Sequence, residues 1–150
     1  MPAWFDSMIG EWRGPSRLFL GPEAEFACES TLVAEPTGMG KFLQVRYTWS
    51  HEGAPHEGVL LGVVASSGNA SAGWADSWHQ SGSVLHLKGA FDGTEFSVTG
   101  SYNVGEGPDW GWRIALAPSG GRGLRMTMTN IEPGGEEYPA VIAEYERAGK

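Results

Sequence analysis

The amino-acid sequence predicts an all-β domain of short antiparallel strands, arranged as a sandwich or a barrel. Apolar and polar residues alternate along many short segments, and clusters of glycine, proline and asparagine separate those segments. No segment shows the periodicity of a long crossover helix, which disfavours a parallel α/β fold. Because the chain has 150 residues and no shift in composition, we expect one domain over 1–150.

The chain is predicted to open with a short helical turn over 2–9, with a small apolar face formed by Trp4, Phe5, Met8 and Ile9. Ten strand segments follow: 11–20, 25–34, 41–50, 57–65, 70–80, 84–91, 94–104, 110–116, 123–130 and 138–145. Turn-forming residues separate most of these segments. Asp92-Gly93 is the best candidate for a two-residue hairpin, because a type I′ turn requires two positive φ angles.

Three segments show most clearly which face is directed inward. Their alternating apolar residues are Val45, Tyr47 and Trp49, then Trp110, Trp112, Ile114 and Leu116, then Leu124, Met126 and Met128. Arg46, Arg113 and Arg125 have the opposite parity, and the simplest interpretation places them in solvent. A β-bulge would reverse the parity of a strand and bring its arginine inside, where it would anchor a ligand carboxylate.

Composition excludes several classes of partner. The chain has 10 Lys and Arg against 18 Asp and Glu, a net charge of −8, and no basic cluster of the kind that nucleic acids require. Cys28 is the single cysteine, so no intramolecular disulfide is expected. No apolar run approaches the roughly 20 residues of a membrane helix, and the N-terminus lacks a signal-peptide pattern. We therefore expect a cytoplasmic protein that binds neither nucleic acid nor a membrane.

A series of short motifs, taken in order, resembles one known family. The motifs are GEWRG at 10–14, GKFL at 40–43, WADS at 74–77, GAFDG at 89–93, GGEE at 134–137 and EYER at 144–147. The series is similar to an uncharacterised bacterial calycin-like (lipocalin-like) family of unknown function, distantly similar to lipocalins and fatty-acid-binding proteins. The resemblance implies one up-and-down β-barrel of about eight to ten strands around a cavity. It also implies that Trp12 plugs the closed end, with Arg147 over its ring.

The same opening motif is similar to that of nitrobindin-like barrels, which bind haem through a histidine on a late strand. The last predicted strand here contains no histidine, so we expect neither haem nor another cofactor. His51 and His56 do not have a usual zinc spacing, and His79 and His86 form only a weak pair across a predicted turn. No metal site is predicted.

The most informative constellation is Trp74-x-Asp76-x-Trp78, because a period of two places all three side chains on one face of a strand. If the indoles point inward, Asp76 is a buried carboxylate beside a cavity, and a candidate ligand anchor or general acid/base. In the alternative interpretation, Asp76 satisfies nearby hydroxyl, indole or backbone groups. The pattern also fits a strand whose tryptophans face outward, with Ser77 and His79 on the other face.

These observations favour a barrel cavity that binds a small apolar or amphipathic molecule. The candidate ligand-binding residues are Tyr47, Trp49, Trp74, Asp76, Trp78, Trp112, Met126 and Met128. One alternative is a cofactor-free enzyme of the isomerase, cyclase or lyase type, with Asp76 as acid/base and Tyr47 or His86 as helper. A second alternative is a non-catalytic module that forms a homodimer through exposed tryptophan faces.

Overall fold

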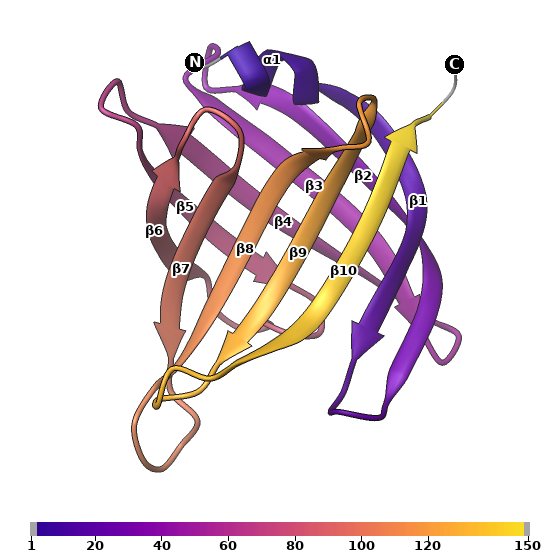
Figure 1. Ribbon diagram of the computed structural model, residues 1–150, viewed down its shortest axis with the longest axis vertical. Coiled ribbons are helices and arrows are strands. Elements are labelled where there is room, and N and C mark those ends of the chain that lie inside the picture. The colour runs from indigo at the N-terminus through magenta and orange to yellow at the C-terminus, as the bar shows by residue number, and fades with distance from the viewer. Residues whose placement is uncertain (1–2, 149–150) are drawn as a thin grey trace.

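The predicted all-β class is confirmed by a computed structural model, which describes residues 3–148 (Figure 1). A short helix is followed by ten strands. The elements are α1 (Ala3–Met8), β1 (Gly10–Phe19), β2 (Glu25–Thr37), β3 (Phe42–His51), β4 (Ala54–Val64), β5 (Asn69–Asp76), β6 (Leu85–Phe91), β7 (Phe96–Tyr102), β8 (Trp110–Ser119), β9 (Gly123–Ile131) and β10 (Glu137–Arg147). Each strand matches one predicted segment, with ends that differ by a few residues.

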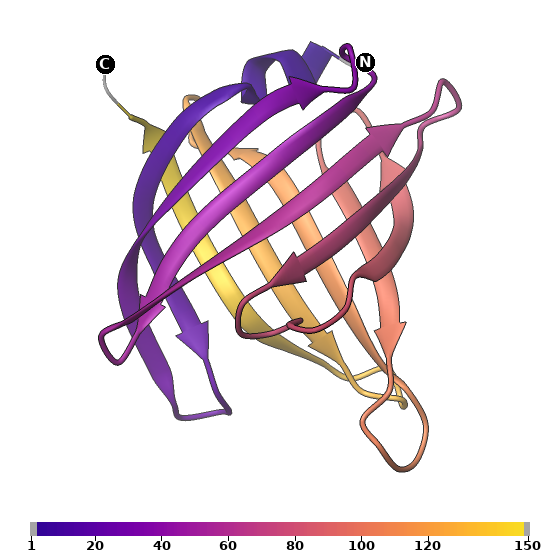
Figure 2. The same ribbon diagram turned by 180° about the vertical axis from the view of Figure 1, so that it is seen from behind.

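The ten strands form one closed antiparallel barrel in up-and-down order, and β1 closes it by pairing with β10 (Figure 2). Closure removes the edge strands that would otherwise expose unpaired backbone groups. At this seam Trp12 is opposite Arg147, and Leu18 is opposite Val141. Gly14 makes the seam possible, because a Cβ atom there would lie 1.9 Å from the carbonyl oxygen of Glu144.

Helix α1 lies across one end of the barrel, near both ends of the chain (Figure 1). Phe5 of α1 is 1% exposed and packs its ring against Phe91 and Phe96, with centroid distances of 6.0 and 5.6 Å. In the described part of the chain α1 is the only helix, and its six residues are too few to cross a bilayer.

Trp12 fills the barrel just beneath α1. Its indole Nε1–H donates to the carbonyl oxygen of Met8 at 2.8 Å. The guanidinium carbon of Arg147 lies 4.4 Å from the centre of the Trp12 ring, within the range of a cation–π interaction. Arg147 also donates to the carbonyl oxygens of Ile9, at 2.9 Å, and Ser7. This end of the barrel is therefore closed by helix, indole and guanidinium together.

The three arginines whose orientation the sequence left open all lie on the outer face of the barrel. Each forms an ion pair with a glutamate of another strand: Arg46 with Glu35, Arg113 with Glu137, and Arg125 with Glu144. The strands keep the predicted parity, so Tyr47, Trp112 and Met126 are buried inside. None of these arginines is placed to anchor a ligand carboxylate within the barrel.

The hairpin between β6 and β7 differs from the predicted two-residue turn. The loop contains four residues, 92–95, and within it only Gly93 has a positive φ, of 99°. The Asp92 carboxylate accepts hydrogen bonds from the backbone N–H groups of Thr94, at 2.9 Å, and Glu95, at 2.8 Å. These bonds close the longer loop, so a type I′ turn is not needed.

Candidate functional site

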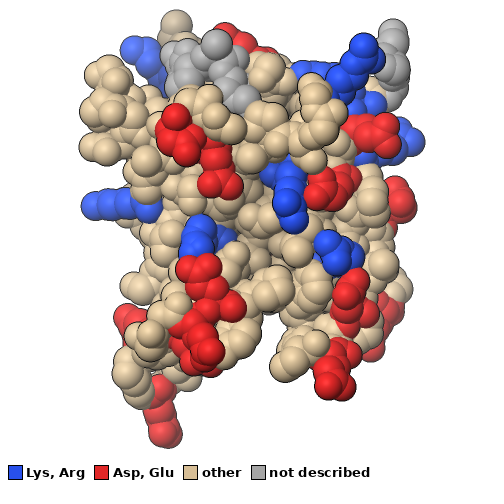
Figure 3. All heavy atoms as spheres, in the orientation of Figure 1, with Lys and Arg blue, Asp and Glu red and all other residues tan. Residues whose placement is uncertain are grey.

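Most of the predicted site residues gather at the end of the barrel opposite α1, which we call the mouth. Five connections surround it: 20–24, 52–53, 77–84, 103–109 and 132–136. Towards this end β1 and β10 diverge (Figure 1), and the space-filling view is notched between two groups of loops (Figure 3).

Strand β5 ends at Asp76 because the Asp76 side chain closes the turn that follows. Its Oδ1 accepts hydrogen bonds from the backbone N–H groups of Trp78 (2.8 Å), His79 and Gln80 (3.2 Å). Aspartate commonly ends a strand in this way. The prediction that one strand continues past Asp76 and keeps Trp78 on the face of Trp74 is therefore wrong. Trp78 lies at the mouth and is 38% exposed.

The second carboxylate oxygen of Asp76 connects β3 and β5 to this turn. Oδ2 accepts hydrogen bonds from the Tyr47 hydroxyl at 3.0 Å and, at 3.0 Å, from Nδ1 of His79. The Tyr47 hydroxyl in turn accepts from the Trp74 indole N–H at 2.7 Å. Gly58 leaves room for this network, because a Cβ there would lie 2.3 Å from the Tyr47 hydroxyl oxygen and 2.6 Å from Asp76 Cβ.

The network keeps Asp76 ionised. Burial by itself raises the pKa of Asp76, but the hydrogen bond and charge of His79 and the backbone N–H groups of Trp78 and His79 outweigh it. The pKa therefore lies below its ordinary value of 3.8. Burial and the charge of Asp76 raise the pKa of Tyr47 well above 10.0, so Tyr47 remains a hydroxyl donor. Asp76 is consequently an acceptor and not a proton donor at neutral pH.

His79 is the side chain that presents reactive chemistry to the mouth. Because ionised Asp76 can only accept, the Nδ1 atom of His79 carries a proton, and in the neutral ring the lone pair is on Nε2. The His79 side chain is 10% exposed and lies among indole rings. Ring centroids are 5.3 Å away for Trp49, 5.2 Å for Trp112 and 4.8 Å for Trp78.

Several buried nitrogen atoms of this aromatic cluster have no hydrogen-bond partner within residues 3–148. They are His79 Nε2, Trp49 Nε1, Trp112 Nε1 and His51 Nδ1. A buried polar atom without a partner costs about 1–3 kcal/mol, and folded proteins retain few of them. Their concentration at one end of the barrel is typical of a site that binds another molecule.

His79 borders two spaces of very different size. The inner space is lined by Ser30, Tyr47, Trp49 and Met128, among others, and its volume of about 10 Å³ corresponds to one water molecule. In the described structure this inner space is therefore far smaller than the expected ligand-sized cavity. Large buried side chains, among them Trp74, Tyr145 and Met128, occupy the interior.

The outer space lies at the mouth and is also bordered by His79. It has a volume of about 190 Å³ and is lined by Trp74, Leu85, Tyr102 and Trp112, among others. The Tyr102 hydroxyl donates to Asn130 at 2.6 Å at its border. This volume accommodates one ring with a short substituent.

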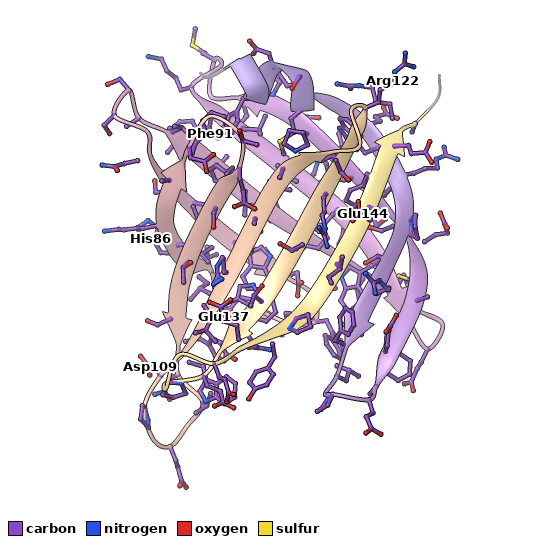
Figure 4. The ribbon with its side chains drawn as sticks, viewed as in Figure 1. His86, Phe91, Asp109, Arg122, Glu137 and Glu144 are labelled. Carbon is purple, nitrogen blue, oxygen red and sulfur yellow. The ribbon has the colours of Figure 1, made fainter. Side chains whose placement is uncertain are left out.

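The predicted site residues thus separate into groups. Tyr47, Trp49, Trp74, Asp76 and Trp112 come together around His79, and Met126 and Met128 border only the inner space. His86 is on the outer face of β6 and points away from the barrel (Figure 4), so it is not a helper of Asp76.

His79 is the central residue that sequence reasoning missed, because a continuous strand would put it on the face opposite Asp76. The available signal was the cluster of turn-forming residues from Ser77 to Ser83 directly after Asp76. Within the described chain no three His, Cys, Asp or Glu side chains are grouped to hold a metal ion.

Fold and site together define a closed ten-stranded antiparallel barrel with a buried aspartate–histidine pair at its mouth. The chain belongs to the family described as "Protein of unknown function (DUF1579)", which matches residues 1–147. The prediction that the chain belongs to a family of unknown function is therefore confirmed. No curated protein sequence matches this chain.

A solved structure similar to this one is titled "Crystal Structure of Rv2717c from M. tuberculosis". The two chains superpose with a TM-score of 0.67 over 98% of this chain and 96% of that one, at 16% sequence identity. At this identity the similarity shows a shared barrel fold.

Proposed function

We propose that this protein binds a small amphipathic molecule at the mouth of its barrel. The ligand's polar group donates a hydrogen bond to His79 Nε2, and its apolar part lies against the rings of Trp74 and Trp112. The observation that carries this proposal is the His79 ring itself, which is oriented by ionised Asp76 and has a buried, unpartnered Nε2 atom.

The shape of the barrel restricts the ligand to a small one. The outer space of about 190 Å³ accepts a single ring, whereas the inner space accepts one water molecule. The proposed site therefore differs from the deep central cavity of a calycin-like barrel, although the up-and-down order of strands is the one such barrels share. The proposed ligand rests on the mouth and leaves the packed interior undisturbed.

Benzyl alcohol is a suitable probe for two reasons. Its hydroxyl can donate to His79 Nε2 and accept from an indole N–H, and its ring fits the outer space. We expect a titration followed by ¹H–¹⁵N NMR to shift the indole cross-peak of Trp112 saturably, and to leave that of Trp12 unchanged. His79→Phe, which keeps a ring but removes Nε2, should raise Kd about tenfold, the equivalent of one hydrogen bond.

His86→Phe is the matched control, because it makes the same change on the outer face of β6. It should leave Kd and the indole shifts unchanged, and melting curves should show that both variants fold. Absence of a saturable shift, or an equal Kd in wild type and a folded His79→Phe variant, would overturn the proposal.

A second candidate function is proton-transfer catalysis, with His79 Nε2 as general base. The observation that favours it is the 3.0 Å hydrogen bond between His79 Nδ1 and ionised Asp76, an arrangement that holds a histidine in the tautomer of a base. The acid/base assigned to Asp76 by the sequence thereby moves to His79.

Deuterium exchange tests this second candidate. Cyclopentanone in D₂O should exchange its α-hydrogens faster with the protein than in buffer alone, and His79→Phe should remove the difference. Exchange at the buffer rate would exclude this activity for a substrate of that size, and would leave the binding proposal unaffected.

A further inference from the structure

The charges at the two ends of the barrel are arranged very differently. The five connections at the mouth contain Glu23, Glu52, Glu106, Asp109, Glu132 and Glu136, and no lysine or arginine. The connections at the end with α1 contain Lys41 and Arg122 together with Asp92 and Glu95, so their formal charges cancel. Figure 3 shows acidic side chains on both groups of loops beside the notch, and Figure 4 shows Asp109 and Glu137 at this end.

The interior of the barrel is also negatively charged. Asp76 is the only charged residue that is buried within residues 3–148, and none of the described lysines or arginines is buried. The two arginines nearest the mouth loops, Arg17 and Arg113, face outward and pair with Glu25 and Glu137. A ligand carboxylate would therefore meet an ionised Asp76 and no buried lysine or arginine of the described residues.

The rings at the mouth also suit a positive charge. Trp49 packs edge-to-face against Trp78 with a centroid distance of 5.4 Å, and His56 stacks on Trp49 at 4.6 Å. Trp78 is 38% exposed, and the outer space itself is lined by Trp74 and Trp112, whose rings stack with centroids 5.2 Å apart. The faces of indole rings attract organic cations.

From these observations we infer that the ligand of the mouth is a small organic cation, namely a protonated amine on an aromatic or other apolar body. This inference rests on the proposed function and names its ligand class. The ammonium N–H donates to the unpartnered Nε2 of His79, ionised Asp76 lies directly behind that ring, and the loop carboxylates attract the cation from solution. The ligand is thus of the opposite charge to the carboxylate that an inward arginine would anchor.

Three probes with the same ring and different charge test the inference: benzylamine, benzyl alcohol and benzoate, at neutral pH and low salt, followed through the indole cross-peaks. Benzylamine should bind about tenfold more tightly than benzyl alcohol, at the lower end of the enrichment that focused charge produces. Benzoate should bind more weakly than either. Raising the salt concentration to 0.5 M should weaken the binding of benzylamine and leave the binding of benzyl alcohol unchanged.

Charge-neutralising variants locate the effect. A variant that combines Glu106→Gln, Glu132→Gln and Glu136→Gln should lower the affinity for benzylamine about threefold or more. The affinity for benzyl alcohol should stay unchanged. The matched control combines Glu11→Gln, Glu95→Gln and Glu146→Gln near the α1 end, which removes the same net charge and should leave both affinities unchanged.

The outcomes separate the two proposals. If benzyl alcohol binds at Trp112 but benzylamine binds no more tightly than benzoate, the cation inference is overturned and the proposed function stands. If the control substitutions lower the affinity for benzylamine as much as the mouth substitutions do, the ligand is selected by the net charge of the protein and not by the mouth. The inference is then also overturned. If none of the three probes binds, both proposals fail.

Discussion

Replacing Asp76 by asparagine separates the charge of this carboxylate from its shape. Asparagine can still accept from the backbone N–H groups after β5 through one oxygen. Its amide nitrogen, however, would face two donors, the Tyr47 hydroxyl and Nδ1 of His79, where the carboxylate Oδ2 accepts from both. The histidine would have to change its tautomer, which would put a proton on Nε2.

The magnitude follows from the hydrogen bonds at Asp76. A hydrogen bond to a charged group contributes about 1 kcal/mol more to the free energy of unfolding than a neutral one does, and the substitution loses this difference. Removal of the buried charge also removes its desolvation cost, which recovers part of the loss. We expect the free energy of unfolding at pH 7 to fall by about 3 kcal/mol. For a chain of this size the melting temperature would then fall by about 6–12 °C.

The loss of stability in Asp76→Asn should depend on pH, in a direction set by the pKa of Asp76. Because the pKa of Asp76 in the folded protein lies below its ordinary value of 3.8, the unfolded chain binds this proton more tightly than the folded protein does. The stabilisation is therefore complete above about pH 4 and is lost as the pH falls through the lower, folded-state pKa. The difference in stability between wild type and Asp76→Asn should therefore shrink as the pH falls below about 4.

Urea unfolding of both proteins from pH 2 to 7, followed by tryptophan fluorescence, measures this difference. Asp92→Asn is the control, because Asp92 also accepts two backbone hydrogen bonds in a turn but is exposed at the other end of the barrel. It should change stability much less at pH 7. Equal stability of wild type and Asp76→Asn, or a difference that does not vary with pH, would refute the assigned role of the ionised carboxylate.

Two further substitutions address the two ends of the barrel. Gly58→Ala would push a methyl group into Tyr47 and Asp76, and should cost about 1–3 kcal/mol in urea unfolding together with loss of benzyl alcohol binding; unchanged binding would contradict the close packing described. Arg147→Ala removes the cation above Trp12, and should lower the free energy of unfolding by about 1 kcal/mol while leaving binding at the mouth unchanged. Weaker binding at unchanged stability would contradict the assignment of Arg147 to the closed end.

The sequence by itself determined the strands and their inner faces. Alternation of the kind seen at Val45, Tyr47 and Trp49 reports directly which side of a strand is buried, because successive side chains point to opposite faces. The same parity placed Arg46 outside. These are local properties, and a short window of residues carries them.

What only the tertiary structure decided is where alternation stops and which distant groups meet. Asp76 bonds to its own turn and ends β5, and this brings His79 back among the rings of Trp49 and Trp112 from other strands. Whether the barrel is hollow also depends on how side chains from ten strands fill a shared volume. No local pattern contains that information, because the volume is set by closure of the whole sheet.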